Sequence, residues 1–210
     1  MGIVFGGILL LVVAMGISRF AFTPILPFMR RDVGFSLEIA GFLASSNYIG
    51  YFIGALWAGF IYRQRKKILL ASVVFNVLSV GLMGLIELYS VWLVLRLIAG
   101  ITGGLIFVLT SSIVMDYLAK QSLSRWSGYV FSGIGLGIAI SGLCVPIIEA
   151  KFAWQGTWLG LGILSAVFLL MTTILWKGLE VQDSLKVAKS LDTKITKGFM
   201  PWLIVSYGLE

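Results

Sequence analysis

The chain has 210 residues, of which 59% are hydrophobic and 12% are charged, whereas about a quarter of the residues in a soluble domain are charged. This composition excludes a soluble globular domain and indicates a polytopic membrane protein. The net charge of +7 gathers in the connectors between apolar runs, where it sets topology, so we predict no nucleic-acid partner.

The sequence contains no histidine and a single cysteine, Cys144. Disulfides within the chain, thiolate–zinc sites and nucleophiles activated by histidine all need residues that are missing here. We therefore expect no metal, no cofactor and no catalytic residue.

Six apolar runs are long enough to cross the hydrocarbon core of a bilayer, which takes about 20 helical residues. They cover residues 3–28, 37–62, 68–87, 91–115, 126–149 and 157–177. None of them alternates in the manner of a barrel strand, so each is predicted to be a helix. We expect an all-α integral membrane protein in which residues 1–177 form a six-helix transmembrane unit.

The rest of the chain is a charged connector and the beginning of another apolar run. Within residues 178–198, apolar side chains recur at helical spacing: Val181, Leu185, Ala188, Leu191 and Ile195. This pattern predicts an amphipathic helix on the inner leaflet, and a mobile linker is the alternative. Residues 199–210 are predicted to begin a seventh helix that the chain end truncates, so we expect a fragment of a longer protein.

The basic residues are distributed unevenly. Eleven of the 16 lysines and arginines lie in the segments after the second, fourth and sixth runs, and three, Arg30, Arg31 and Lys151, lie on the opposite side. Because cytoplasmic loops carry the excess of Lys and Arg, the amino terminus is predicted to be cytoplasmic. A multi-pass protein of the cytoplasmic (inner) membrane is expected.

The first run contains an arginine, Arg19. A guanidinium at mid-membrane costs about 2.5–3.5 kcal/mol on insertion scales, so it should face protein or water, and its default role is in a pathway or a ligand site. The alternative is that it snorkels or binds carbonyls freed by Pro24 and Pro27. Thr23 and Asn47 are candidates to complete a translocation site, with helix–helix hydrogen bonding as the alternative for both.

The fourth run carries a second arginine, Arg96, which is our other candidate for the translocation site. The alternative is a packing face with a snorkelling arginine. Small residues one turn apart let a neighbouring helix approach closely. Five glycines of the fourth and fifth runs are therefore predicted to lie in helix contacts: Gly100, Gly103, Gly104, Gly133 and Gly137.

Six helices with short loops, followed by a longer charged connector and a seventh helix, resemble the amino-terminal half of a major facilitator superfamily transporter. In the loop after the second run, the sequence keeps the basic half of that superfamily's motif as Arg63, Lys66 and Lys67. Tyr62 replaces the motif's aspartate, and Arg65 replaces its second glycine. The resemblance implies a gating role for the three basic residues, and electrostatic anchoring to the inner leaflet is the alternative.

Two further patterns carry the resemblance. Arg96 followed by Gly100 is similar to the superfamily's fourth helix, although Ala99 stands in place of its usual glutamine. The pattern Gly-x-x-Arg-Phe-x-x-Thr-Pro-x-x-Pro at residues 16–27 is similar to the YbfB-type branch. The resemblance implies a bundle of two three-helix repeats in which helices 1 and 4 line a central cavity and helices 3 and 6 face lipid.

The function implied is secondary transport of a small solute by alternating access, coupled to protons or driven by the solute gradient. Two arginines lie inside the runs, whereas the nearby acidic residues lie only at run ends: Glu38, Glu87, Asp116 and Glu149. Arginines without such neutralisation indicate an anionic or amphipathic solute. A carboxy-terminal six-helix half or a second copy would complete the site, and membrane lipid would surround the protein. A non-transporting scaffold or receptor is the alternative. An intramembrane enzyme is not expected, because no evident base is present.

Overall fold

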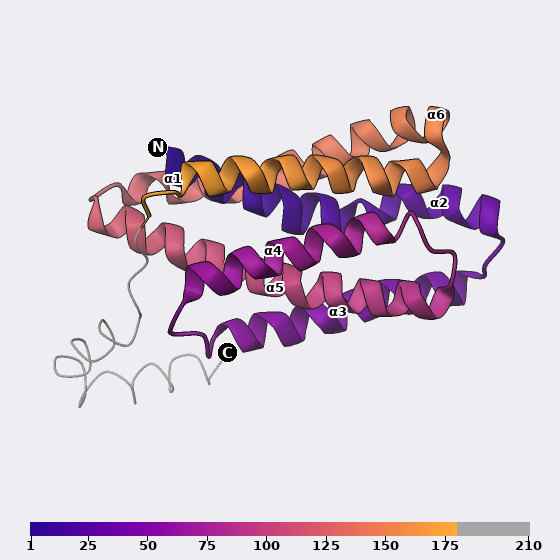
Figure 1. The fold of residues 1–210 in the computed structure, drawn as a ribbon, viewed down its shortest axis with the longest axis horizontal. Coiled ribbons are helices and arrows are strands. Elements are labelled where there is room, and N and C mark those ends of the chain that lie inside the picture. The colour runs from indigo at the N-terminus through magenta and orange to yellow at the C-terminus, as the bar shows by residue number, and fades with distance from the viewer. Residues whose placement is uncertain (180–210) are drawn as a thin grey trace, which may run out of the picture.

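The computed structural model describes residues 1–179, and this part of the chain contains helices and no strands. The predicted seventh helix and all but the first two residues of the predicted connector lie outside the described residues. The helices run roughly along one long direction, as Figure 1 shows.

The first helical segment is continuous but changes its hydrogen bonding along its length. It consists of α1 (Gly2–Leu11), the π-helix η1 (Val12–Phe20) and α2 (Phe22–Val33). Four α-helical elements follow this segment: α3 (Leu37–Ala58), α4 (Arg65–Leu82), α5 (Tyr89–Lys120) and α6 (Ser127–Leu175). A short 3-10 turn, η2 (Ser124–Trp126), lies just before α6.

Four helical stretches of the described part are long and apolar enough to cross a membrane: Gly2–Val33, Leu37–Ala58, Tyr89–Lys120 and Ser124–Leu175. The protein is therefore all-α and multi-pass. The third predicted run, 68–87, corresponds to α4, which is 18 residues long and begins with three charged residues. For that reason α4 does not belong to this set of four.

Several helix boundaries differ from the ends of the predicted runs. A helix can extend into polar residues beyond an apolar run, and it can also end before the run does. The first segment extends past residue 28, and its last helical residue is Val33. The next residue, Gly34, caps the helix in a left-handed conformation with a φ of 80°. The second run was predicted to reach residue 62, but α3 ends at Ala58, and α4 begins after Gln64, whose φ is 53°. The fourth run, predicted to end at residue 115, continues to Lys120.

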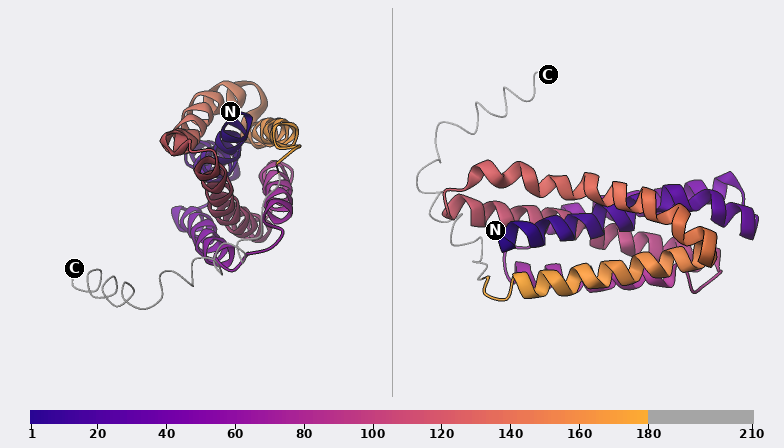
Figure 2. Two further views of the ribbon diagram at one scale, coloured as in Figure 1. Left: turned by 90° about the vertical axis from the view of Figure 1, so that its left-hand side faces the viewer. Right: turned by 90° about the horizontal axis from the view of Figure 1, so that it is seen from above.

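The fifth and sixth predicted runs overlap the two parts of the 49-residue element α6, which consists of two helices joined at a kink. Inside α6, Ala153 has φ 53° and ψ −173°, which is not helical. Within α6 the chain doubles back on itself, as Figures 1 and 2 show. We call residues 127–152 the N-arm of α6 and residues 154–175 its C-arm.

The two arms of α6 pack on different partners through glycines. In the N-arm, a methyl group added to Gly133 would lie 3.1 Å from the Leu11 side chain, and Gly137 faces the backbone of Gly16. The C-arm lies against α4, where the backbone of Gly81 is within 3.1 Å of such a methyl on Gly162. The C-arm also contacts the first segment, since the Thr172 hydroxyl donates to the Gly6 carbonyl at 3.4 Å. The first segment therefore lies between the two arms, and α4 lies beside the C-arm.

The most extensive contact between helices joins α3 and α5. A methyl group on Gly100 would collide with the backbone carbonyl of Asn47, and one on Gly104 would lie 2.5 Å from that of Tyr51. Gly103 faces the first segment instead, where a methyl would stand 3.7 Å from the Ala14 carbonyl, an ordinary contact. The two helices therefore meet backbone to backbone over more than one turn.

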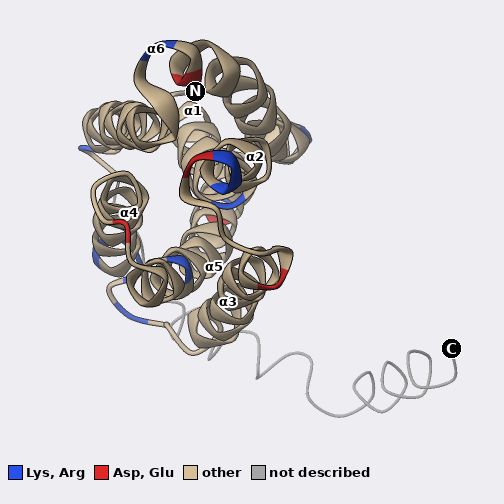
Figure 3. Ribbon diagram, turned by 90° about the vertical axis from the view of Figure 1, so that its right-hand side faces the viewer, with Lys and Arg blue, Asp and Glu red and all other residues tan. Residues whose placement is uncertain are grey.

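The charged residues mark the two ends of the molecule, and most of the ribbon in Figure 3 is uncharged. We call the end that carries the connector between α3 and α4 the basic end, since Arg63, Arg65, Lys66 and Lys67 gather there. Large apolar side chains are exposed along the helices; Phe75 on α4 is 59% exposed and Ile174 on α6 is 72% exposed. Such exposure suits a protein surrounded by hydrocarbon.

Candidate functional site

The π-helix η1 shapes the middle of the first segment. Runs of π-helix are rare and often occur at functional sites. Its carbonyls are bound by side chains of other helices: the Ser141 hydroxyl donates to the Gly16 carbonyl at 3.2 Å, and Arg96 Nη1 donates to the Ser18 carbonyl at 3.1 Å. Pro24 lacks the N–H that would bond the Phe20 carbonyl. Side chains from α5 and α6 thus hold the widened turn in place.

Arg19 lies at the end of this π-helix, among aromatic rings. Its guanidinium carbon is 4.3 Å from the ring centroid of Tyr51, 5.0 Å from that of Tyr48 and 5.6 Å from that of Phe20. These distances are within the range of cation–π attraction. We call Arg19 and these three rings the aromatic cage.

Within residues 1–179, the nitrogens of Arg19 have no hydrogen-bond partner. Nε is buried without a hydrogen bond, and across residues 1–179 neither Nη nitrogen donates to a protein atom or pairs with a carboxylate. A guanidinium that stacks on rings keeps its donors in the plane of the group. Arg19 therefore offers a positive charge and an unused planar donor fork.

Arg96 has a different environment, although it touches the same turn. It is 3% exposed, and it donates to the carbonyls of Ser18 at 3.1 Å and Leu43 at 3.5 Å. Its guanidinium carbon lies 4.4 Å from the ring centroid of Phe22. Arg96 therefore ties α5 to the first segment and to α3, which is the carbonyl-binding role considered above for Arg19.

The predicted polar partners are not gathered around either arginine as ligands. The Asn47 amide donates to the Arg96 carbonyl at 3.0 Å, and its Oδ1 is buried without a partner. This bond links α3 to α5. Thr23 is exposed one turn beyond Arg19.

The basic residues after α3 also separate into two groups. Arg63 and Lys67 are exposed. Lys66 Nζ donates to the carbonyls of Trp176 at 2.7 Å and Leu179 at 3.0 Å, and so holds the end of α6 against the start of α4.

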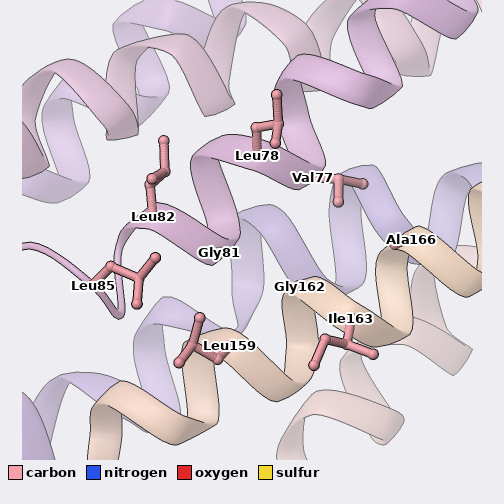
Figure 4. A pocket seen from close by; sticks show the side chains of 9 residues that line it. All are labelled: Val77, Leu78, Gly81, Leu82, Leu85, Leu159, Gly162, Ile163 and Ala166. Carbon is pink, nitrogen blue, oxygen red and sulfur yellow. The ribbon is translucent and has the colours of Figure 1, made fainter.

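A hollow of about 250 Å³ lies between α4 and the C-arm of α6 (Figure 4). Apolar side chains from both helices line it, among them Leu78, Leu82 and Ile163. It offers no polar side chain for a charged solute, so we place the candidate site at the aromatic cage.

The comparisons with known proteins agree with a transport role. Residues 11–210 match the family described as "Uncharacterised MFS-type transporter YbfB". The chain belongs to this MFS transporter family. The resemblance predicted from the sequence is thereby confirmed, and the family is one of multi-pass membrane transporters, not of enzymes.

Three curated relatives show what kinds of MFS protein are similar. The chain is 29% identical over 155 residues to a gallate transporter of Pseudomonas putida, covering 72% of this chain and 34% of the relative. It is 25% identical over 189 residues to a hexuronate transporter of Bacillus subtilis, and the match covers 87% of this chain and 43% of that transporter. It is 25% identical over 186 residues to a probable chloroplastic anion transporter 6 of Arabidopsis thaliana, and the match covers 83% of this chain and 36% of that transporter. The chain thus spans less than half the length of each of these relatives.

Sequence reasoning missed several residues of this MFS protein's candidate site. Tyr48 and Tyr51 are three residues apart on one face of the second run, and that spacing was the available signal. Ser141, which binds the π-helix, gave no signal beyond being a polar residue in an apolar run. Arg65 was identified only as a departure from the superfamily's loop motif, but it is 5% exposed and pairs with Asp116.

Proposed function

We propose that this chain is one half of a secondary transporter that moves a small organic anion by alternating access, driven by protons or by the solute gradient. The observation that carries the proposal is the Arg19 guanidinium, whose donors have no partner among the described residues. A charge held inside a membrane-spanning segment needs an opposite charge or water. A transported anion meets that need each time it binds.

The names of the relatives favour the same chemistry. Hexuronate and gallate both carry a carboxylate, and a guanidinium binds a carboxylate through two parallel hydrogen bonds. We assign the anion to Arg19, since the donors of Arg96 are already directed at backbone carbonyls. Arg96 then positions the π-helix, and Thr23 and Asn47 lie at the margin of the site.

The proposed topology has six crossings of the cytoplasmic membrane, counted as the first segment, α3, α4, α5 and the two arms of α6. They are arranged as two three-helix repeats, with the first segment and α5 toward the cavity. Because the chain spans less than half of its relatives, a second six-helix half or a second copy supplies the opposite wall. The excess of Lys and Arg at the basic end favours a cytoplasmic amino terminus. Lys66, with Arg63 and Lys67, would gate there by holding and releasing the end of α6.

Uptake by the complete natural protein in proteoliposomes tests the proposal, with glucuronate and 4-hydroxybenzoate as probes. Arg19→Lys should lose most of the uptake per folded molecule, because lysine lacks the planar fork, and Arg19→Gln should lose more. Arg31→Lys, at an exposed helix end, is the matched control and should keep its uptake. Unchanged uptake in Arg19→Gln, or no uptake of either probe by the natural protein, would refute an anion site at Arg19. A scaffold or receptor would give the second result.

A further inference from the structure

Aromatic rings continue from the cage along three helices. The Tyr51 ring centroid on α3 is 6.3 Å from that of Phe107 on α5, and Phe107 is 6.2 Å from Phe131 on the N-arm of α6. We call Tyr51, Phe107 and Phe131 the aromatic ladder. These residues come from parts of the sequence more than 20 positions apart and meet only in the folded protein.

The ladder is accessible. Phe131 is 40% exposed, Tyr51 and Phe107 are half-buried, and the neighbouring Tyr48 is 53% exposed. The rings contact one another at tilts of 50° and 52°. A third ring between two others needs a separation of roughly 7 Å, twice the 3.5 Å contact distance. A ligand therefore lies over the exposed side of the ladder and not between its rings.

One end of the ladder carries the charge. Arg19 stacks on Tyr51, the first ring, and its guanidinium has donors without partners among the described residues. The other two rings make no contact with Arg19 and lie toward the basic end. A surface with a cation at one end and flat apolar rings beyond it is complementary to a molecule with the reverse arrangement, an anionic group attached to a flat ring.

We infer that the site selects planar aromatic carboxylates, with the carboxylate on Arg19 and the ring over the aromatic ladder. This inference rests on the proposed function and deepens it, because any carboxylate satisfies Arg19 whereas only an aromatic ring makes full use of the ladder. An acyl chain of a lipid would use the rings but not the charge. A sugar acid would use the charge but leave the rings without a face to stack on.

The test compares two acids matched in size, hydroxyl position and charge: 4-hydroxybenzoate and 4-hydroxycyclohexanecarboxylate. Their dissociation constants are measured by calorimetry on the complete natural protein in nanodiscs. The aromatic acid should bind about tenfold more tightly. Phe107→Leu should reduce this preference to about threefold or less and leave the affinity for the cyclohexane acid unchanged. Phe131→Leu serves if Phe107→Leu does not fold.

Two further variants separate the inference from the function beneath it. Arg19→Gln should weaken both acids alike, and Phe75→Leu, an exposed ring on α4 outside the ladder, should change neither. Equal affinity for the two acids, or a tenfold preference that survives both ladder variants, overturns the aromatic selectivity while leaving the anion site in place. If neither acid binds, the proposed function fails together with the inference.

Discussion

Arg65 and Asp116 form an ion pair of 2.8 Å that joins the start of α4 to the last part of α5. Arg65 also donates to Ser112 at 2.7 Å, and its side chain is 5% exposed against 52% for that of Asp116. A charge this buried depends on its partners, because removing one of them leaves part of the desolvation cost uncompensated.

Asp116→Asn should therefore destabilise the protein by about 1–2 kcal/mol, less than for a fully buried pair because the carboxylate is half exposed. Thermal unfolding of the complete natural protein in detergent measures the change. Asp32→Asn is the control, since the Arg31–Asp32 pair is exposed at 60% and 31% and should contribute little. Equal melting temperatures for the two variants would contradict the prediction.

The crossing of α3 and α5 predicts a difference between two neighbouring glycines. Gly100→Ala should destabilise the protein by about 1–3 kcal/mol, because the new methyl group collides with the Asn47 carbonyl and neither backbone can move away without disturbing its helix. Gly103→Ala introduces an ordinary contact and should fold normally. The amount of monodisperse protein after detergent extraction, together with its melting temperature, distinguishes them. A Gly103→Ala variant as unstable as Gly100→Ala would show that the crossing is not the cause.

The two arginines should respond differently to substitution. Arg96→Gln removes donors from the carbonyls of Ser18 and Leu43, so we expect a loss of about 1–3 kcal/mol in stability. Arg19→Gln breaks no hydrogen bond in the described structure and should leave the melting temperature nearly unchanged while weakening carboxylate binding. Measuring melting temperature and binding on the same samples checks both. If Arg96→Gln kept its melting temperature but lost carboxylate binding, Arg96 and not Arg19 would be the anion-binding residue.

Thiol labelling tests the orientation of the chain. Lys67→Cys and Lys151→Cys are exposed positions at opposite ends of the molecule, and each is made in a Cys144→Ser background. If the basic end is cytoplasmic, an impermeant maleimide applied to intact cells should label position 151 and should reach position 67 only after permeabilisation. The opposite pattern would place the amino terminus outside.

The sequence predicted where the helices lie better than how they are bonded. Hydrophobic runs indicate which residues suit hydrocarbon, and this located the first segment and α5 within a few residues of their ends. The gap between the fifth and sixth runs, residues 150–156, contains Ala153, where the helix is interrupted. The runs could not predict the π-helix around Gly16, because side chains of distant helices bind its carbonyls. The two arginines could be identified from the sequence because a charged side chain in an apolar run is costly in lipid and therefore unusual. Their different partners, backbone carbonyls for Arg96 and rings for Arg19, depend on the packing of α3 and α5 and have no local signature.

The reversal of α6 at Ala153 also affects the order in which the protein can assemble. The Trp176 indole donates to the Ile3 carbonyl at 3.1 Å and fills the space beside Gly6. Trp176 lies 173 positions after Ile3, so the indole reaches this carbonyl only after the whole of α6 has been synthesised and has turned back. Until then the start of the first segment lacks its indole neighbour.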